Sequence, residues 1–325
     1  MAKPTSRRFI YKIVDGLEID VDVYLPSCSP GKQETGHPVI VDIHGGAFML
    51  GSSAMVNKDQ VEDCLNRSWI VLAPNHRLCP GVDLLKGPMQ DCRDLLAWIY
   101  DGSFQKALST GEECKHRVDL DHVFAFGTSS GGTLALSLGF DVPRPVAGIF
   151  DMYGPCNFSD PFWETPLPHV QARLPAKPID DCKSKVFEEF PVPIVGGVSL
   201  EGQTNPGGPN FADPRVTFAL TQIANGKVMS AVFPSRDWDE VDPLLNVAKA
   251  GSRFPPTFIV HGAADTMVPI SLSRDLYAAL RKAGVKCGMT EVPDEEHTFA
   301  GTMKVGTRTW DLQREGFDFL ESLIE

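Results

Sequence analysis

The five residues Gly127-Thr128-Ser129-Ser130-Gly131 restrict the fold more than any other part of the chain. The apolar run 123–126 before them predicts a buried strand, and the residues from Thr133 onward predict a helix. In G-x-S-x-G between a strand and a helix, the serine occupies a sharp, strained turn where flanking β-carbons would collide. The hydroxyl then lies at a helix N-terminus, where the dipole favours developing negative charge. Ser129 is therefore a candidate nucleophile, and a plain glycine- and serine-containing turn is the alternative.

A serine nucleophile needs a base, and in this strand–turn–helix context the chain order is serine, acid, histidine. Three histidines follow the serine: His169, His261 and His297. An apolar strand at 257–260 ends in a glycine-containing loop that carries Asp265, the predicted orienting carboxylate. Only His297 follows this acid, which makes it the predicted base. His261 is interpreted as a structural histidine at the end of the strand.

A second glycine-rich segment follows an earlier strand. The apolar run 39–43 is followed by His44-Gly45-Gly46-Ala47. Acyl transfer generates an oxyanion, and each preorganised N–H donor to it contributes about 3–4 kcal/mol. Successive glycines let backbone amides point into a site without obstruction by side chains. The predicted donors are the amides of Gly45, Gly46 and Ser130, and His44 is expected to brace the loop through hydrogen bonds.

These segments resemble the α/β-hydrolases of the hormone-sensitive-lipase-like carboxylesterase group, and the chain is also similar to arylformamidase-type relatives. The resemblance also rests on Asn75-His76-Arg77-Leu78-Cys79-Pro80 and on the segment from Asp91 to Trp98, so it extends from about residue 38 to residue 300. It implies an α/β-hydrolase fold with a serine–aspartate–histidine triad. The chain departs from the group at Ala47, where a third glycine is usual, and at Thr128-Ser129-Ser130, where Asp-Ser-Ala is commoner.

The pattern along the chain predicts an α/β fold with a mainly parallel central sheet. From residue 39 onward apolar strands alternate with helical patterns, which is typical of a sheet covered on both faces. The stretches Phe9–Val14 and Leu17–Leu25 alternate around Asp15-Gly16 and predict an antiparallel hairpin at the sheet edge, and residues 27–36 predict a surface loop. The other expected strands are 39–43, 69–73, 123–126, 146–152, 257–260 and 287–292, and the expected helices are 58–66, 89–100, 133–140, 272–283 and 309–324.

Residues 155–250 interrupt this alternation. These 96 residues hold 13 of the 26 prolines, a density that favours short helices and disfavours long strands. They lie between two core strands, where α/β-hydrolases insert a cap above the nucleophile. We predict a hydrolase core of residues 1–154 and 251–325 and a cap or lid insertion of residues 155–250. Its nine phenylalanines and tryptophans are expected mostly to pack within the insertion, with one or two facing a substrate.

Charge and composition restrict the classes of partner, cofactor and cellular location that we expect. A formal net charge of −12 argues against nucleic acid or an anionic membrane surface as a partner. The chain has no apolar run of about 18 residues and no apolar segment behind its basic start, so we expect neither a membrane span nor a secretory signal, and a cytoplasmic location. Its eight cysteines lack C-x-x-C or zinc-like spacing and are expected to be reduced. No cofactor or metal is predicted, because the common metalloprotease, P-loop and dinucleotide motifs are absent.

The predicted function is that of a serine hydrolase that cleaves a small, apolar carboxylic ester or related acyl compound through an acyl-enzyme on Ser129. The same residues would also suit a biosynthetic enzyme that carries out acyl transfer, lactonisation or carbon–carbon bond cleavage on a polyketide-like intermediate. A non-catalytic ligand receptor is the third alternative. It is the least favoured, because such receptors typically lack one residue of the triad.

Overall fold

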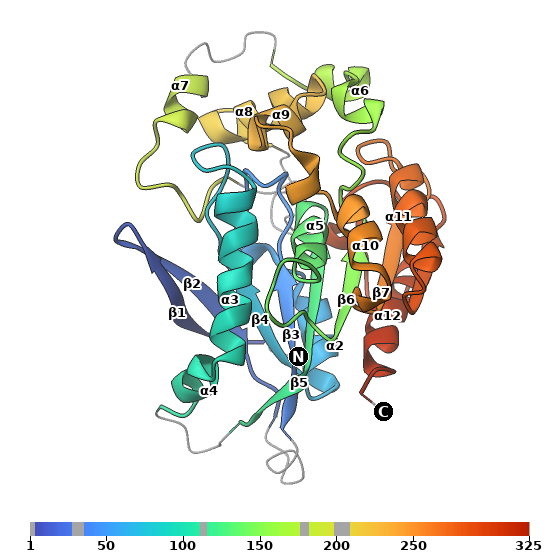
Figure 1. The fold of residues 1–325 in the computed structure, drawn as a ribbon. Coiled ribbons are helices and arrows are strands. Elements are labelled where there is room, and N and C mark those ends of the chain that lie inside the picture. Colours follow the sequence, from blue (N-terminus) through green and yellow to red (C-terminus); the bar gives the residue numbers. More distant parts are fainter. Residues whose placement is uncertain (1–3, 28–35, 111–115, 176–181, 198–208, 325) are drawn as a thin grey trace.

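An eight-stranded sheet runs through the centre of the protein (Figure 1), seen in a computed structural model that describes residues 4–27, 36–110, 116–175, 182–197 and 209–324. The strand order is β1-β2-β4-β3-β5-β6-β7-β8. The β1–β2 and β2–β4 pairs are antiparallel and the remaining pairs are parallel. The strands are β1 (Ser6–Val14), β2 (Leu17–Tyr24), β3 (His37–Ile43), β4 (Ile70–Pro74), β5 (Val118–Thr128), β6 (Gly148–Met152), β7 (Thr257–Gly262) and β8 (Cys287–Val292).

Helices cover both faces of this sheet (Figure 1). One face packs against α2 (Lys58–Asn66) and α12 (Arg308–Glu321), which contribute buried residues to one hydrophobic cluster. The other face packs against α3 (Gln90–Tyr100), α4 (Ser103–Leu108), α5 (Ser130–Ser137), α10 (Pro243–Ala250) and α11 (Ile270–Lys282). In β3 alternate residues enter opposite clusters, with Val39 and Val41 on one face and Ile40 on the other. Burial on both faces explains why residues 39–41 of this strand are all apolar.

The predicted mainly parallel sheet and the N-terminal antiparallel hairpin are confirmed. Several boundaries differ from the expected ones. The helix expected at 133–140, after a helix-like start at Gly131, spans Ser130–Ser137. Gly131 and Gly132 lie in its first turn, where close packing against neighbouring segments leaves no room for side chains. The strand expected at 123–126 extends over Val118–Thr128, and α4 was not predicted. Most of the expected surface loop, residues 28–35, lies outside the described residues.

The insertion predicted at 155–250 is helical in its described part. It contains the short helices α6 (Pro168–Gln171), α7 (Cys182–Phe187), α8 (Pro214–Ala224) and α9 (Val228–Val232), followed by α10. Aspartate caps followed by proline begin both α8 and α10, which is how the prolines are accommodated. In Figure 1 helices α6 to α9 lie above the end of the sheet at which β5 meets α5. The division of the chain into core and cap stays a prediction.

No helix in the described part of the chain is both long and apolar enough to cross a membrane. The six described cysteines, at positions 64, 79, 92, 156, 182 and 287, are free thiols. Burial raises the pKa of Cys64 and Cys156 well above the ordinary value. Their thiolate forms are therefore strongly disfavoured.

A buried carboxyl group lies against the helix that follows the candidate nucleophile. Asp151 of β6 is fully buried, and its Oδ1 accepts the Gly154 N–H at 3.0 Å. Its Oδ2 has no hydrogen-bond partner among the described residues. A β-carbon on Gly132 of α5 would come within 2.2 Å of Oδ1, so the carboxyl group packs directly against this helix. Burial raises the pKa of Asp151 to about 7, so the folded protein favours the neutral acid below that pH.

Asp151→Asn should gain stability relative to the wild type as the pH rises from about 4 to about 7. The folded pKa of Asp151 lies above the unfolded value of about 3.9. Below pH 4 both states hold the proton. Between the two pKa values only the unfolded state releases it, which lowers wild-type stability by about 1.4 kcal/mol per pH unit. Urea unfolding of both proteins at several pH values tests this, with the exposed Asp311→Asn as the matched control. A difference independent of pH would contradict the prediction.

Candidate active site

Ser129 occupies the turn between β5 and α5, with φ 51° and ψ −126°. This positive φ is strained for a residue with a side chain. The glycines on either side are needed for steric reasons. A β-carbon on Gly127 would lie 2.1 Å from the Gly131 carbonyl oxygen, and one on Gly131 would lie 2.0 Å from the carbonyl oxygen of Ile43 in β3. The turn can therefore form only where both flanking positions lack side chains.

The three residues predicted as a triad lie within hydrogen-bond distance of one another, although 168 positions separate Ser129 from His297. Ser129 Oγ is 2.9 Å from His297 Nε2, and His297 Nδ1 is 2.6 Å from Asp265 Oδ2. All three come from loops at the carboxyl ends of parallel strands, after β5, β7 and β8. Because those ends meet at one edge of the sheet, residues far apart in the sequence converge there.

The carboxylate of Asp265 is held on both oxygens. Its Oδ1 accepts the backbone N–H groups of Met267 and Val268, both at 2.8 Å. Its Oδ2 accepts from His297 and, at 3.1 Å, from Nε2 of His261. Burial raises the pKa of Asp265, but the charges and hydrogen bonds of His297 and His261 outweigh this effect and leave it well below its usual range. The residue is therefore ionised throughout the physiological pH range.

His261 contributes more to this site than its interpretation as a structural strand-end histidine implied. It is fully buried, and its Nε2 also lies 2.8 Å from the carbonyl oxygen of Val268, so Nε2 carries the proton. Its Nδ1 lies 2.8 Å from the Ser273 hydroxyl oxygen. Sequence spacing could not reveal this bond to Asp265, because it depends on how the loop after β7 folds back. Tyr153 adds a second support, since its ring packs edge-on against His297 with centroids 4.9 Å apart.

Residues 44–51, which we call the oxyanion loop, pass beside the nucleophile turn. Gly46 has φ 128°, and a β-carbon there would lie 2.2 Å from the Leu50 carbonyl oxygen. Its own carbonyl accepts the N–H groups of Met49 and Leu50 at 3.0 and 2.9 Å. The Ala47 N–H belongs to the same trans peptide as the Gly46 carbonyl and points in the opposite direction, away from the Met49 and Leu50 N–H groups.

Gly46 and Ala47 both line the cavity beside Ser129, whereas Gly45 is not among the described residues that do so. Ala47 was not among the predicted donors. Its φ of 53° is in the region that favours glycine, which only the backbone reveals. Ser130 is the first residue of α5, so its backbone N–H has no acceptor within the helix.

The His44 side chain stabilises the oxyanion loop through a hydrogen bond and ring stacking. Its Nδ1 lies 2.7 Å from the Gly45 carbonyl oxygen, and its ring stacks on His76 with centroids 4.6 Å apart and an interplanar angle of 9°. Burial and the neighbouring His76 lower the pKa of His44 to about 3, and burial lowers that of His76 to about 4. Both rings are therefore neutral at physiological pH and act as packing and hydrogen-bonding groups.

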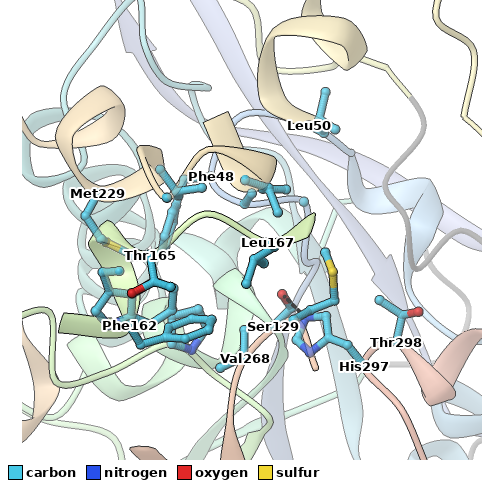
Figure 2. A pocket seen from close by; sticks show the side chains of 18 residues that line it. Phe48, Leu50, Ser129, Phe162, Thr165, Leu167, Met229, Val268, His297 and Thr298 are labelled. Carbon is cyan, nitrogen blue, oxygen red and sulfur yellow. Dashed lines mark hydrogen bonds between the residues drawn. The ribbon is translucent and has the colours of Figure 1, made fainter. Parts of the chain in front are cut away.

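The cavity above Ser129 is lined mainly by apolar side chains. Figure 2 shows the Ser129 and His297 side chains together beneath Leu167, with Phe162 and Met229 along the wall away from Thr298. None of the described lining residues is acidic, lysine or arginine, and His297 is the one titratable base. The lining residues are Gly46, Ala47, Phe48, Leu50, Ser129, Pro155, Phe162, Trp163, Thr165, Leu167, Ile223, Gly226, Val228, Met229, Met267, Val268, His297 and Thr298.

The predicted insertion supplies one wall of this cavity. Of its nine phenylalanines and tryptophans, Phe162 and Trp163 line the cavity, whereas Phe158, Phe218 and Phe233 are buried. The Trp163 indole N–H donates to the carbonyl oxygens of residues 156 and 157, so its ring presents a carbon surface. Among the described residues, no three histidine, cysteine or acidic side chains are grouped so as to hold a metal ion.

Two family models match the chain in separate parts. The BD-FAE family matches residues 21–177, and the prolyl oligopeptidase family matches residues 211–325. The first match contains the oxyanion loop and the nucleophile turn, and the second contains Asp265 and His297.

Curated relatives are fungal polyketide synthases. The chain is 28% identical to the non-reducing polyketide synthase ausA of Aspergillus calidoustus, over 95% of this chain and 14% of that protein. It is 29% identical to the non-reducing polyketide synthase trt4 and 28% identical to the 5-methylorsellinic acid synthase, both of Aspergillus terreus. These matches cover 89% and 98% of this chain and 13% of each relative. The chain thus spans only about a seventh of the length of these much longer proteins.

Solved structures with the same fold include esterases. Esterase 2 of Thermogutta terrifontis, phosphoramylated by tabun, superposes with a TM-score of 0.64 at 16% identity, covering 99% of this chain and 96% of that one. The propionate-bound form of that esterase gives 0.62 at 17% identity, covering 98% and 95%. A protein of unknown function from Staphylococcus aureus gives 0.67 at 20% identity, covering 98% and 100%.

Gly131→Ala should destabilise the protein by about 3 kcal/mol, because the new β-carbon would overlap the backbone carbonyl of Ile43, which cannot move without shifting β3. Gly81→Ala is the matched control, since its β-carbon would meet only Val192 at an ordinary 3.6 Å. Denaturant unfolding of both variants measures the difference. Equal stabilities for the two variants would contradict the steric account of the turn.

Proposed function

This chain is an α/β-hydrolase, as its sequence predicted, and we propose that it is a serine hydrolase that cleaves neutral, apolar carboxylic esters or related acyl compounds. The observation that carries the proposal is a pair of hydrogen bonds at one end of an apolar cavity: Ser129 Oγ lies 2.9 Å from His297 Nε2, and His297 Nδ1 lies 2.6 Å from Asp265 Oδ2. The esterase fold of the structural neighbours and the two hydrolase family matches support the same reading.

In the proposed reaction His297 Nε2 takes the proton of Ser129 as Oγ attacks the acyl carbonyl. Asp265 holds the imidazole with Nδ1–H toward its carboxylate and stabilises the imidazolium that forms. The carbonyl oxygen gains negative charge, which the amides of Gly46, Ala47 and Ser130 would stabilise. His297 then protonates the leaving alcohol, and water attacks the acyl-enzyme to release the acid. A donor role for Gly45 stays a prediction.

The charge character of the cavity defines the substrate class. Transfer of an ionised group into an apolar site without a partner is strongly unfavourable. Because the lining contributes no arginine, lysine, aspartate or glutamate, a charged acyl group would find no counter-ion there.

The biosynthetic alternative has an observation of its own. Nearly the whole chain is similar to one segment of non-reducing polyketide synthases. The same serine and histidine would then transfer, cyclise or cleave a polyketide-like acyl group instead of hydrolysing a simple ester. Both readings require an acyl group on Ser129, and they differ in what removes it.

A fluorophosphonate probe should label Ser129, and short p-nitrophenyl esters should be hydrolysed. Ser129→Ala should abolish labelling and lower kcat by about 10⁴-fold or more. Ser137→Ala is the matched control, because its hydroxyl lies within α5 and donates to Leu134. Absence of labelling in folded wild-type protein would contradict the serine hydrolase proposal. Labelling with negligible turnover of every simple ester would favour the biosynthetic alternative.

The neutral ester p-nitrophenyl hexanoate should be preferred over the p-nitrophenyl monoester of adipic acid by about 100-fold in kcat/KM at pH 7. The two acyl chains have similar lengths, and they differ in a terminal carboxylate that would lose its hydration inside the cavity. Initial rates on both esters give the ratio. Comparable kcat/KM values would show that the acyl chain does not enter the apolar cavity.

A further inference from the structure

The predicted insertion is hydrogen-bonded to the oxyanion loop as well as lying above it. Gly51 at the end of the loop pairs with Gly196 of the insertion, with N–H···O distances of 2.7 and 3.2 Å in the two directions. Leu78, which lies just after β4, donates its N–H to the Pro193 carbonyl at 2.8 Å. The backbone of residues 193–196 thus contacts the loops that follow β3 and β4.

Arg215, near the start of α8, makes the most direct of these contacts. Its side chain leaves the insertion and is almost completely buried, with 4% of the residue exposed. Nη1 donates to the Met49 carbonyl at 3.1 Å and to the Cys79 carbonyl at 2.7 Å. Nη2 and Nε donate to Glu189 Oε2 at 2.6 and 3.2 Å, which balances the guanidinium charge.

Arg215 closes a ring of hydrogen bonds that includes the Phe48 and Met49 carbonyl groups of the oxyanion loop. The Cys79 N–H donates to the Phe48 carbonyl at 2.9 Å, and the Cys79 carbonyl accepts from Arg215, which also donates to Met49. Phe48 and Met49 belong to the turn that closes on the Gly46 carbonyl. The orientation of the Gly46–Ala47 peptide therefore depends on carbonyl groups that Arg215 and Cys79 hold in position.

Local packing is adapted to this arginine. A β-carbon on Gly196 would lie 2.6 Å from Arg215 Cδ, so only glycine leaves space for the side chain to pass. The guanidinium group has five donors in a planar fork, which lets one side chain serve two carbonyl groups and a carboxylate at once. A lysine could supply a charge but not this fixed geometry.

We propose that Arg215 is a positioning residue for the oxyanion hole, and that the insertion is thereby a fixed part of the catalytic apparatus. This proposal rests on the proposed function, because it assigns an origin to the alignment of the Gly46 and Ala47 amides. Arg215 does not line the cavity in the described structure, so it acts through the Met49 and Cys79 carbonyl groups and not on the substrate.

Arg215→Met keeps the length of the side chain and removes its donors. It should lower kcat for an ester by about 10- to 100-fold, since small displacements of catalytic groups have effects of that size. KM should change less than about threefold, because the apolar cavity is unaltered. The pH at which kcat/KM falls on the acid side should stay as in the wild type, because the bonds among Ser129, Asp265 and His297 are untouched.

Two further variants and one control separate this role from a general loss of folding. Arg215→Lys should recover part of the lost kcat, and Gly196→Ala, which displaces the arginine without removing it, should lower kcat in the same direction. Arg236→Met is the matched control, since Arg236 belongs to the insertion but pairs with the exposed Glu164. Amide hydrogen exchange over residues 45–51 should be faster in Arg215→Met than in the control, whether or not a substrate is turned over.

The outcomes are distinguishable. Wild-type protein that neither labels at Ser129 nor hydrolyses esters would overturn the proposed function, and with it an oxyanion role for Arg215. Active wild type together with a folded Arg215→Met variant of unchanged kcat and unchanged exchange at 45–51 would overturn the positioning role alone. A large rise in KM with unchanged kcat would assign Arg215 to substrate binding and would likewise overturn it.

Discussion

The close approach of the nucleophile turn to β3 is the contact on which the site depends. Gly131 lies so near the Ile43 carbonyl that a β-carbon would come within 2.0 Å of it. Ile43 is directly followed by His44 and the oxyanion loop, so the packing that seats Ser129 also brings the loop amides beside it. The strain at Ser129, with its φ of 51°, is maintained because the parallel pairing of β3 and β5 holds both sides of the turn.

The site combines a buried carboxylate, Asp265, whose two oxygens both accept hydrogen bonds, with a cavity whose described lining has no acidic, lysine or arginine side chain. Asp265 accepts four hydrogen bonds, two from backbone amides and two from histidines, which offset the cost of burying its charge. Arg215, which contacts the oxyanion loop, is paired with Glu189. In the proposed reaction, fixed N–H dipoles beside an apolar cavity would interact more strongly with a developing oxyanion than they would in bulk water.

The predicted insertion both lines the cavity and is hydrogen-bonded to the oxyanion loop. Phe162, Leu167 and Met229 form an apolar wall, and Arg215 and Gly196 bind the oxyanion loop. In the proposed reaction, a wall of this kind would limit the water that reaches the acyl-enzyme, and its packing would therefore affect whether the acyl group is hydrolysed or transferred. The likeness to segments of polyketide synthases and the likeness to esterases are therefore compatible with one set of catalytic groups.

The sequence by itself determined the alternation of strands and helices from residue 39 to about residue 152, the serine turn, and the selection of Asp265 and His297 as candidates. Each of these depends on local periodicity, on glycine sterics or on order along the chain. Only the tertiary structure decided that Ala47 faces the cavity, that His261 bonds to Asp265, and that Arg215 reaches the oxyanion loop. Those features arise from loops at the carboxyl edge of the sheet folding against one another, so no spacing along the chain encodes them.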